Sequence, residues 1–423
     1  MVAGSGRAAP APIRYRAQVR CGDRLLADSL SAVAVERPED PPELLFPAAD
    51  VDTAALVALT GRVERPGLGP ARPWGLAGRI GAVAWTIDGP APAAPWAVGM
   101  TAFAAGAPAD GEKGPHVRIE LLDGAVGADP RDVTVKRYPV WGDVDDLLDI
   151  LDLRPVGPDR FRSVTRPSPR RPVVEGSQML GQAIVAAGRL VPGRRLVSGH
   201  MVFHRAADTG RSLDFVLEPT NQGRTFATLG VGVIQGDRSC ATGSLLLDVT
   251  ADDVIGHQHP PPPVVGPYDA VPHDMSVMGR DVRVVDGAYT NDPAAPAGPP
   301  VIDAWVRFRD LPDDGYLHAA LLAQFTGHMS IAAALRPHAG VSQSQAHQTL
   351  STAINAITLS LHGPVQADRW MLYHHESTFA GAGMTHSTCR VHDGEGRLLA
   401  SFSVDAMVRR FAGGGQGDAR TSL

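Results

Sequence analysis

The sequence lacks the features that most quickly identify a class of protein. Of its 39 basic residues only Lys113 and Lys136 are lysines, the arginines are scattered, and the formal net charge is −6. Such a chain has no general attraction for nucleic acid or an anionic membrane surface. Its three cysteines are far apart and odd in number, so they predict neither a disulfide framework nor a metal motif. We expect no metal and no nucleic-acid partner.

Long apolar runs are also missing. No stretch approaches the ~18 uninterrupted apolar residues of a membrane span, and residues 1–16 lack the apolar centre of a signal peptide. We therefore expect a cytoplasmic protein with no membrane span. A hydrophobic content of 44% and a charged content of 20% are typical of a folded chain. Because 423 residues exceed one ordinary core, two or three domains are expected.

The N-terminal third is a series of short strand-like segments separated by loops rich in Pro and Gly. After a loose stretch at residues 1–12, residues 13–142 are predicted to form a small, mainly β accessory domain with one short helix, Val51–Leu59. Its segment Gly22–Asp52 resembles a small bacterial domain family of unassigned function. Members of that family carry a Cys-Pro-x-Lys-Gly stretch followed by two aromatic residues. Here the corresponding Gly67–Leu76 has no Cys, no Lys and only one aromatic, Trp74, which implies that any activity of the motif is lost.

The rest of the chain repeats one pattern twice. After an acidic amphipathic helix at Asp143–Leu153, an apolar helix at 178–190 precedes four strand-like segments, and the helix Leu311–His338 precedes four more. A buried helix followed by an antiparallel meander predicts a sheet wrapped around a helix. The expected fold is therefore α+β, a tandem (double) hot-dog: residues 143–256, a Pro-rich linker at 257–267, residues 268–412, and a loose tail at 413–423.

The helix predicted at Leu311–His338 has an unusual composition. Pro312, Asp313 and Asp314 provide a helix start, and from Tyr316 to Leu335 the segment is apolar on nearly every side. Such a helix must be enclosed by other elements. Its few polar residues are therefore the first candidates for function.

Residues 143–411 resemble the acyl-CoA thioesterase II family, the double hot-dog thioesterases. The resemblance rests on GSQMLGQA at 176–183, LPDD at 311–314, DRWMLYHHES at 368–377, and GRLLAS at 396–401 with DAMVR at 405–409. It implies hydrolysis of acyl-CoA thioesters without a metal or other cofactor, coenzyme A being part of the substrate. In the family an Asp on the second central helix, with a Thr or Ser and a Gln on neighbouring strands, activates a water molecule.

This sequence departs from that pattern at all three positions. The helix Asp falls on Gly327, the Thr on Ile354 and the Gln on Val404, and none of these side chains can activate water. Gly327 is expected to leave open space where the family places a carboxylate.

Neighbouring residues offer replacements. Gln324 and His328 are four apart and share a helix face, so that they could act as water holder and base; a hydrogen-bonded core histidine is the competing interpretation. Thr352 lies two residues before Ile354 and faces the same side of its strand. We take His328, Gln324 and Thr352 as the candidate catalytic set, and Gly176, Gln178 and Gln182, which match the family, as the candidate substrate-binding set.

Other activities remain open on the sequence. Loss of the family's residues favours a non-catalytic acyl-thioester-binding protein, and a His base would suit a hydratase or dehydratase. The acyl group could be carried by coenzyme A or by a carrier protein. A homo-oligomer built through the hot-dog sheets is a further expectation.

Overall fold

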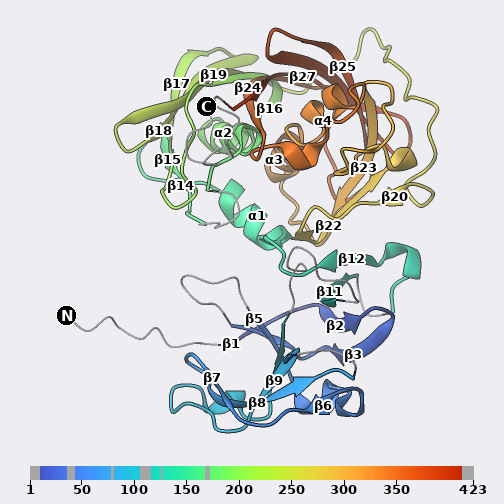
Figure 1. Ribbon diagram of the computed structural model, residues 1–423. Helices are drawn as coiled ribbons and strands as arrows, with labels where there is room; N and C mark the ends of the chain where they lie inside the picture. The colour runs from blue at the N-terminus through green and yellow to red at the C-terminus, as the bar shows by residue number, and fades with distance from the viewer. Residues whose placement is uncertain are drawn as a thin grey trace. The chain divides into compact units, whose positions relative to one another are not determined.

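The computed structural model describes residues 10–35, 43–77, 81–104, 116–124, 127–166 and 172–411. It divides into two compact units, and each is described by itself (Figure 1). Unit 1 is Met1–Gly142 with the short segment Asp274–Met278, and unit 2 is Asp143–His273 with Gly279–Leu423. The tail predicted at 413–423 and most of the loose segment at 1–12 lie outside the described residues, although Pro10–Pro12 forms a strand.

Unit 1 is built mainly on two antiparallel sheets, and β13 and β21 form a further two-stranded sheet. One has the strand order β1-β4-β5-β10-β9-β8-β6, with β7 also pairing with β8, and the other has the order β12-β11-β2-β3. The strands are β1 Pro10–Pro12, β2 Arg16–Cys21, β3 Arg24–Ser29, β4 Val33–Val35, β5 Glu43–Phe46, β6 Val57–Ala58, β7 Val63–Arg65, β8 Gly69–Gly75, β9 Ala84–Ile87, β10 Thr101–Phe103, β11 Val117–Asp123, β12 Thr134–Arg137, β13 Gly142–Asp143 (at the boundary) and β21 Val277–Met278.

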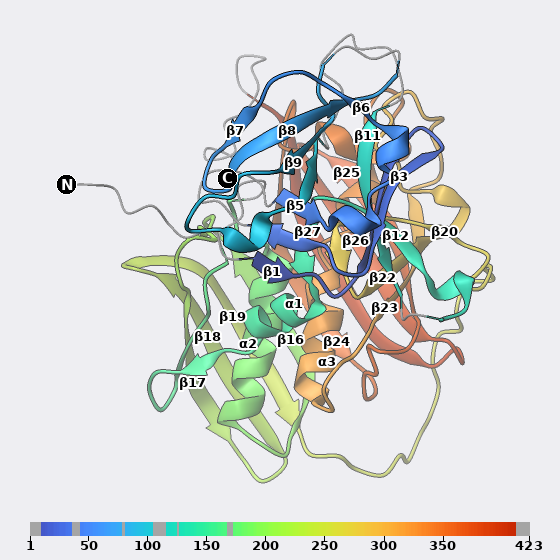
Figure 2. The same ribbon diagram turned by 90° about the horizontal axis from the view of Figure 1, so that it is seen from below.

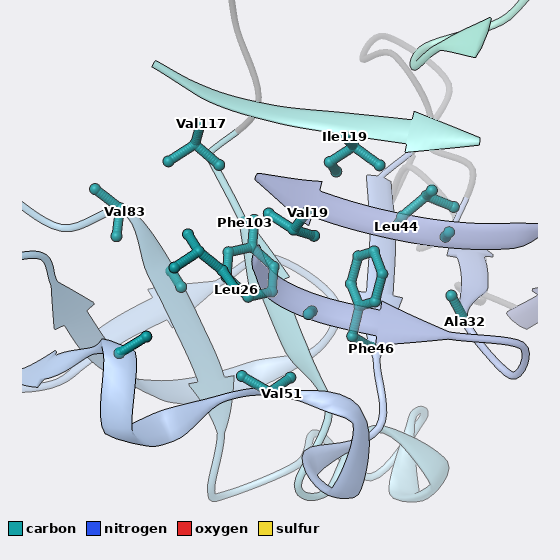
Figure 3. Close-up of a cluster of buried hydrophobic side chains, with 14 of the residues drawn as sticks. Val19, Leu26, Ala32, Leu44, Phe46, Val51, Val83, Phe103, Val117 and Ile119 are labelled. Carbon is teal, nitrogen blue, oxygen red and sulfur yellow. The ribbon is translucent and has the colours of Figure 1, made fainter. Parts of the chain in front are cut away.

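An apolar core joins the two sheets of unit 1. Val19 of β2 and Ile119 of β11 come from one sheet, and Phe46 of β5 and Phe103 of β10 come from the other (Figure 3). The two phenylalanine rings meet edge to face with their centroids 5.6 Å apart, a favoured aromatic geometry. The mainly β prediction for this region is thus confirmed.

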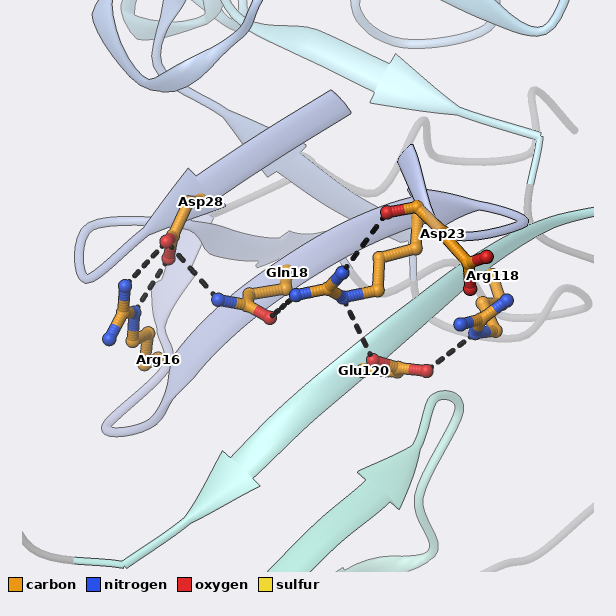
Figure 4. A network of polar contacts seen from close by, with 7 residues as sticks. Arg16, Gln18, Asp23, Asp28, Arg118 and Glu120 are labelled. Atoms are coloured by element: carbon orange, nitrogen blue, oxygen red, sulfur yellow. Dashed lines mark hydrogen bonds and ion pairs between the residues drawn. The ribbon is translucent and has the colours of Figure 1, made fainter. Parts of the chain in front are cut away.

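A row of polar side chains crosses the outer face of the four-stranded sheet (Figure 4). The Arg16 guanidinium donates to Asp28, with Nε 2.6 Å from Oδ1. Farther along, the carboxylate of Glu120 pairs with both Arg20 and Arg118. Because these pairs are partly solvated, each adds little stability.

The prediction of a helix at Val51–Leu59 is wrong. The structure has a single 3-10 turn, Thr53–Ala55, followed by the short strand β6. Asp52 caps this turn by accepting a hydrogen bond from the backbone N–H of Ala54. The β-branched residues and the pairing of Val57 with Gly75 of β8 favour an extended chain over further helix.

Unit 2 is built on one antiparallel sheet of thirteen strands. Its order is β14-β15-β17-β18-β19-β16-β24-β27-β26-β25-β23-β22-β20, and the two halves join where β16 pairs with β24. The strands are β14 Arg154–Pro155, β15 Arg160–Arg162, β16 Arg195–Phe203, β17 Asp214–Gln222, β18 Phe226–Gln235, β19 Arg238–Asp248, β20 Val271–Pro272, β22 Arg280–Val284, β23 Val301–Phe308, β24 Leu350–Leu361, β25 Met371–Gly381, β26 Met384–Asp393 and β27 Leu398–Arg410.

The sheet of unit 2 curls around its helices (Figures 1 and 2). The helices are α1 Val144–Leu151, α2 Gly176–Leu190, α3 Gly315–Phe325 and α4 Ser330–Leu335. Helix α2 packs along α3, and α4 lies against β25 and β26. Helix α1, predicted from its acidic amphipathic pattern, begins with a capping box between Asp143 and Asp146. The predicted hot-dog architecture is confirmed.

The sequence predicted one continuous second central helix. The structure instead has a break in it. The helix stops at Phe325 and restarts at Ser330, with Thr326–Met329 forming an irregular turn between α3 and α4. Thr326 tightens the end of α3, since its hydroxyl donates to the carbonyl of Ala323 at 2.7 Å. The break falls on Gly327, a poor helix former. Among the described residues, no helix combines the length and apolar character required to cross a bilayer.

Candidate functional site

The three positions singled out in the sequence lie close together in unit 2. Gly327 contacts β24, because a Cβ built on it would lie 2.7 Å from Cδ1 of Ile354. Ile354 pairs with Ala406 of β27, and Val404 lies two residues along the same face of that strand. The residues aligned with the family's Asp, Thr and Gln therefore lie near one another, with Val404 buried and Gly327 and Ile354 partly exposed.

Gly327 does not leave open space, contrary to the prediction from the sequence. Besides Ile354, the Cβ of a larger residue would meet Oγ of Ser177 at 2.8 Å. Ser177 is completely buried at the start of α2, and its hydroxyl has no hydrogen-bond partner among the described residues. A side chain at 327 therefore fits only if the Ile354 and Ser177 side chains shift.

A β-bulge lies directly beside this position. Ile354 pairs with Ala406 and Ala356 pairs with Asp405, which leaves Asn355 as an extra residue. Its Oδ1 is buried and has no hydrogen-bond partner in the part of the chain that the structure describes. Bulges occur next to active sites, where they change the direction of a side chain.

A cluster of polar side chains surrounds the break between α3 and α4. We call Glu175, Arg280, Gln324 and His328 the break cluster. Nε2 of Gln324 lies 3.3 Å from Oε2 of Glu175, and Nδ1 of His328 lies 3.6 Å from the same oxygen. The His328 and Glu175 side chains are only 8% and 14% exposed. In such surroundings a charged group must be balanced by partners.

Arg280, 3% exposed on β22, fixes the directions of the hydrogen bonds in this cluster. Its Nη1 lies 3.4 Å from Oε1 of Gln324 and 3.2 Å from Nε2 of His328. Because a guanidinium only donates, Nε2 of His328 must accept. The proton of the neutral imidazole is then on Nδ1, which faces Glu175. The Gln324 amide is oriented the same way, with its oxygen toward Arg280 and its nitrogen toward Glu175.

Glu175 and Arg280 were not among the candidates from the sequence. Gln324 and Glu175 are 149 positions apart, and Arg280 is 48 positions from His328. Glu175 precedes a helix, where a carboxylate is expected as a cap, although its side chain does not cap α2. Arg280 begins the strand RDVRV, which is buried throughout although three of its five residues are charged, and this run of charged residues was the available signal.

The remaining candidates occupy different surroundings. Thr352 is buried on β24, two residues before Ile354. Gln182 is fully buried, and its Nε2 donates to the carbonyl of Ile150, which ties α2 to α1. Gly176 has Phe203 against it, with 2.8 Å between a Cβ and the ring, so packing requires glycine there. Gln178, on the first turn of α2, is partly exposed.

A second buried polar group lies farther inside. His375 of β25 is completely buried, with Nδ1 3.4 Å from Oγ of Ser330 on α4, and desolvation lowers its pKa to about 3. Its Nε2 has no hydrogen-bond partner within the described ranges. The hydroxyl of Ser387 donates to the carbonyl of Ser330. His375 is therefore neutral at physiological pH.

Two matches to family models cover most of unit 2. Residues 165–247 match the acyl-CoA thioesterase N-terminal domain, and residues 257–407 match the acyl-CoA thioesterase C-terminal domain. Among curated proteins, acyl-coenzyme A thioesterase 8 of Mus musculus is 26% identical over 302 residues, which are 64% of this chain and 92% of that protein. Acyl-CoA thioesterase 2 of Haemophilus influenzae is 24% identical over 286 residues, 63% of this chain and 98% of that protein.

Solved structures agree with these matches. An acyl-CoA thioesterase II from Mycobacterium marinum has 25% identity and a TM-score of 0.54, covering 63% of this chain and 99% of that one. A hot-dog protein of unknown function from Alicyclobacillus acidocaldarius, 14% identical, has a TM-score of 0.52 over 63% of this chain and 99% of that one, and it shows the fold alone. With both halves of the double hot-dog matched in order, the chain belongs to the acyl-CoA thioesterase II family.

Proposed function

We propose that unit 2 hydrolyses acyl-CoA thioesters to a free acid and coenzyme A. The observation that carries this proposal is the convergence of Gly327, Ile354 and Val404 beside a buried polar cluster in a chain of this family. The family's own residues are absent, but titratable and amide side chains lie within one helical turn of the same place. A degenerate, binding-only site would not need to retain this set of buried polar side chains, because buried polar groups are costly to desolvate.

The chemistry needs little beyond a positioned water. A thioester carbonyl is electrophilic, so a general base and donors to the developing oxyanion suffice. The first N–H groups of α2 have no partner within the helix, and Glu175 does not cap them. Together with the Ser177 hydroxyl, they are suitable donors to the thioester oxygen. The candidates His328, Gln324 and Thr352 would act on the water, and Gln178 would contact the substrate.

The proposal extends to the partners of the reaction. Water is the only co-reactant, and coenzyme A enters as part of the substrate. We propose coenzyme A rather than a carrier protein as the acyl carrier, a cytoplasmic location, and association of copies through the outer faces of the hot-dog sheets. The oligomeric state is testable by sedimentation of the full chain.

The direct test is thioester hydrolysis by the full chain over a series of acyl-CoA chain lengths, with release of the free thiol measured. Turnover that saturates with substrate supports the proposal. Saturable binding of acyl-CoA with no turnover at any chain length would instead establish a binding protein. A 3-hydroxyacyl or enoyl product, detected by mass spectrometry, would establish a hydratase or dehydratase.

A further inference from the structure

We infer that Glu175 is the general base of unit 2, supplied from the start of α2 in place of the aspartate that the family carries on its second central helix. The inference rests on the proposed hydrolysis and names the residue that performs it. His328, the general base predicted from the sequence, then becomes a positioning residue.

The first argument is position. Gln324 and His328 lie three residues before and one residue after Gly327, and both approach the same oxygen of Glu175. The carboxylate thus lies over the turn that contains Gly327. The side chain comes from the other central helix, which avoids the steric conflict that Ile354 and Ser177 impose on any side chain at 327.

The second argument is the direction of the hydrogen bonds. The Arg280 guanidinium occupies the lone pair of His328 Nε2, and a lone pair that accepts from a cation is a poor base. The Gln324 amide and the His328 Nδ1–H both point toward Glu175. The side-chain donors of Gln324 and His328 therefore converge on the Glu175 carboxylate, while Arg280 donates to Gln324 and His328. Such convergence holds a base in a single orientation.

The third argument is access. Arg280 is 3% exposed, whereas the Glu175 side chain remains 14% exposed. The positioning groups are thus enclosed, and the carboxylate keeps a path to water. Ser177, two residues after Glu175, has a buried hydroxyl without a partner among the described residues, as expected of a group that awaits a ligand.

The reaction step balances within this arrangement. Glu175 takes a proton from water as the water oxygen bonds to the carbonyl carbon of the thioester. The carbon–sulfur bond then breaks, and the protonated Glu175 returns the proton to the departing thiolate. The products are the free acid and the thiol of coenzyme A, and the carboxylate is regenerated.

The test compares Glu175→Gln with the wild-type full chain on the acyl-CoA that the wild type turns over best. General-base catalysis is worth roughly 10²–10⁴-fold, so we expect kcat to fall by about that factor with KM changed less than threefold. Residual activity should rise about tenfold per pH unit, since hydroxide then replaces the base. Glu218→Gln, an exposed carboxylate on β17 of the same unit, is the matched control and should behave as wild type.

A second variant separates catalysis from structure. Glu175→Ala leaves room for a small carboxylate, and added formate should restore its turnover at least several-fold, whereas Glu218→Ala should not respond. If Glu175→Gln does not fold, as judged by circular dichroism, the formate experiment decides. A wild-type rate and pH profile in Glu175→Gln, or a folded Glu175→Ala whose lost activity formate does not restore, overturns this inference but leaves the proposed function in place. A wild type without turnover overturns both.

Discussion

The two hot-dogs of unit 2 share an architecture and differ in their central helices. Helix α2 runs unbroken over Gly176–Leu190, whereas its counterpart is divided into α3 and α4. The interiors differ in the same sense. Around α4 the inward residues include His375, Ser330 and Ser387, all buried and polar. Around α2 the buried residues are mainly apolar, such as Leu180, Ile184 and Phe215, although Ser177 and Gln182 of α2 are also completely buried.

The two hot-dogs therefore have different roles. The first supports the structure, and the second carries most of the candidate reactive groups. An unbroken helix satisfies its own backbone groups and presents small residues for close packing. A broken helix exposes backbone ends and places side chains such as His328 outside the regular helical array. The first hot-dog thus supplies a rigid helix, α2. The N-terminus of α2 points at the break between α3 and α4 in the second hot-dog. The following predictions test this division, from the largest expected effect to the smallest.

The largest effect is expected where α2 and α3 touch. Gly181 and Gly188 face α3, and a Cβ on Gly181 would lie 2.8 Å from the backbone oxygen of Ala320. A Cβ on Gly188 would lie 2.4 Å from the Tyr316 ring. The steric cost of overpacking is typically about 1–3 kcal/mol per site. The better helix propensity of alanine offsets about 1 kcal/mol of this cost at each site. Gly181→Ala with Gly188→Ala should lower the free energy of unfolding by up to about 4 kcal/mol, measured by urea denaturation.

Gly315→Ala is the control for this pair. Gly315 begins α3, and a Cβ there would meet no atom within 4 Å. Alanine should therefore be neutral or stabilise the protein by about 0.5–1 kcal/mol. Equal losses at all three glycines would contradict the view that close helix contact selects glycine at 181 and 188.

The second prediction concerns the polar interior around α4. Burial lowers the pKa of His375 to about 3, so between about pH 3 and 6.5 the unfolded state binds a proton that the folded state does not. Stability must then fall as the pH drops below about 6.5, by about 1.4 kcal/mol per pH unit and about 2 kcal/mol by about pH 5. In His375→Phe this loss should disappear from thermal or urea unfolding measured across that range.

A matched variant, His200→Phe, is the control for this prediction. His200, partly solvated on β16 and bonded to Thr358, lies on the other face of the sheet. His200→Phe should leave the acid dependence unchanged. The assignment to His375 fails if both variants, or neither, alter the slope.

The smallest effect is expected at the break itself. Gly327→Ala should destabilise the protein by about 1 kcal/mol, because its Cβ would meet Ile354 and Ser177. Ile354→Val removes Cδ1 and should relieve much of that cost. A double-mutant cycle by urea denaturation should give a favourable coupling of about 0.5–1 kcal/mol. Additive effects would show that the two residues do not compete for the same space.

Much of the fold was predictable because it rests on local patterns. The four strand-like segments after residue 338 predicted the strands β24 to β27, and the apolar run at 178–190 predicted α2. Predictions failed where nonlocal packing overrode the local pattern. Val51–Leu59 became a turn and a strand, and Leu311–His338 became two helices rather than one. No pattern near Asp274–Met278 indicated that this segment belongs to unit 1.

The candidate site divides in the same way. By itself the sequence determined the pairing of Gln324 with His328, because residues four apart on a helix share a face, and it showed that Gly327, Ile354 and Val404 lack the family's reactive groups. Only the tertiary structure brought Glu175 and Arg280 to that pair and filled the space at Gly327 with Ile354. The physical reason is that the energy and the chemical role of a buried charged group depend on the partners that surround it. Here the partners come from elements far apart in the chain, and only folding chooses them.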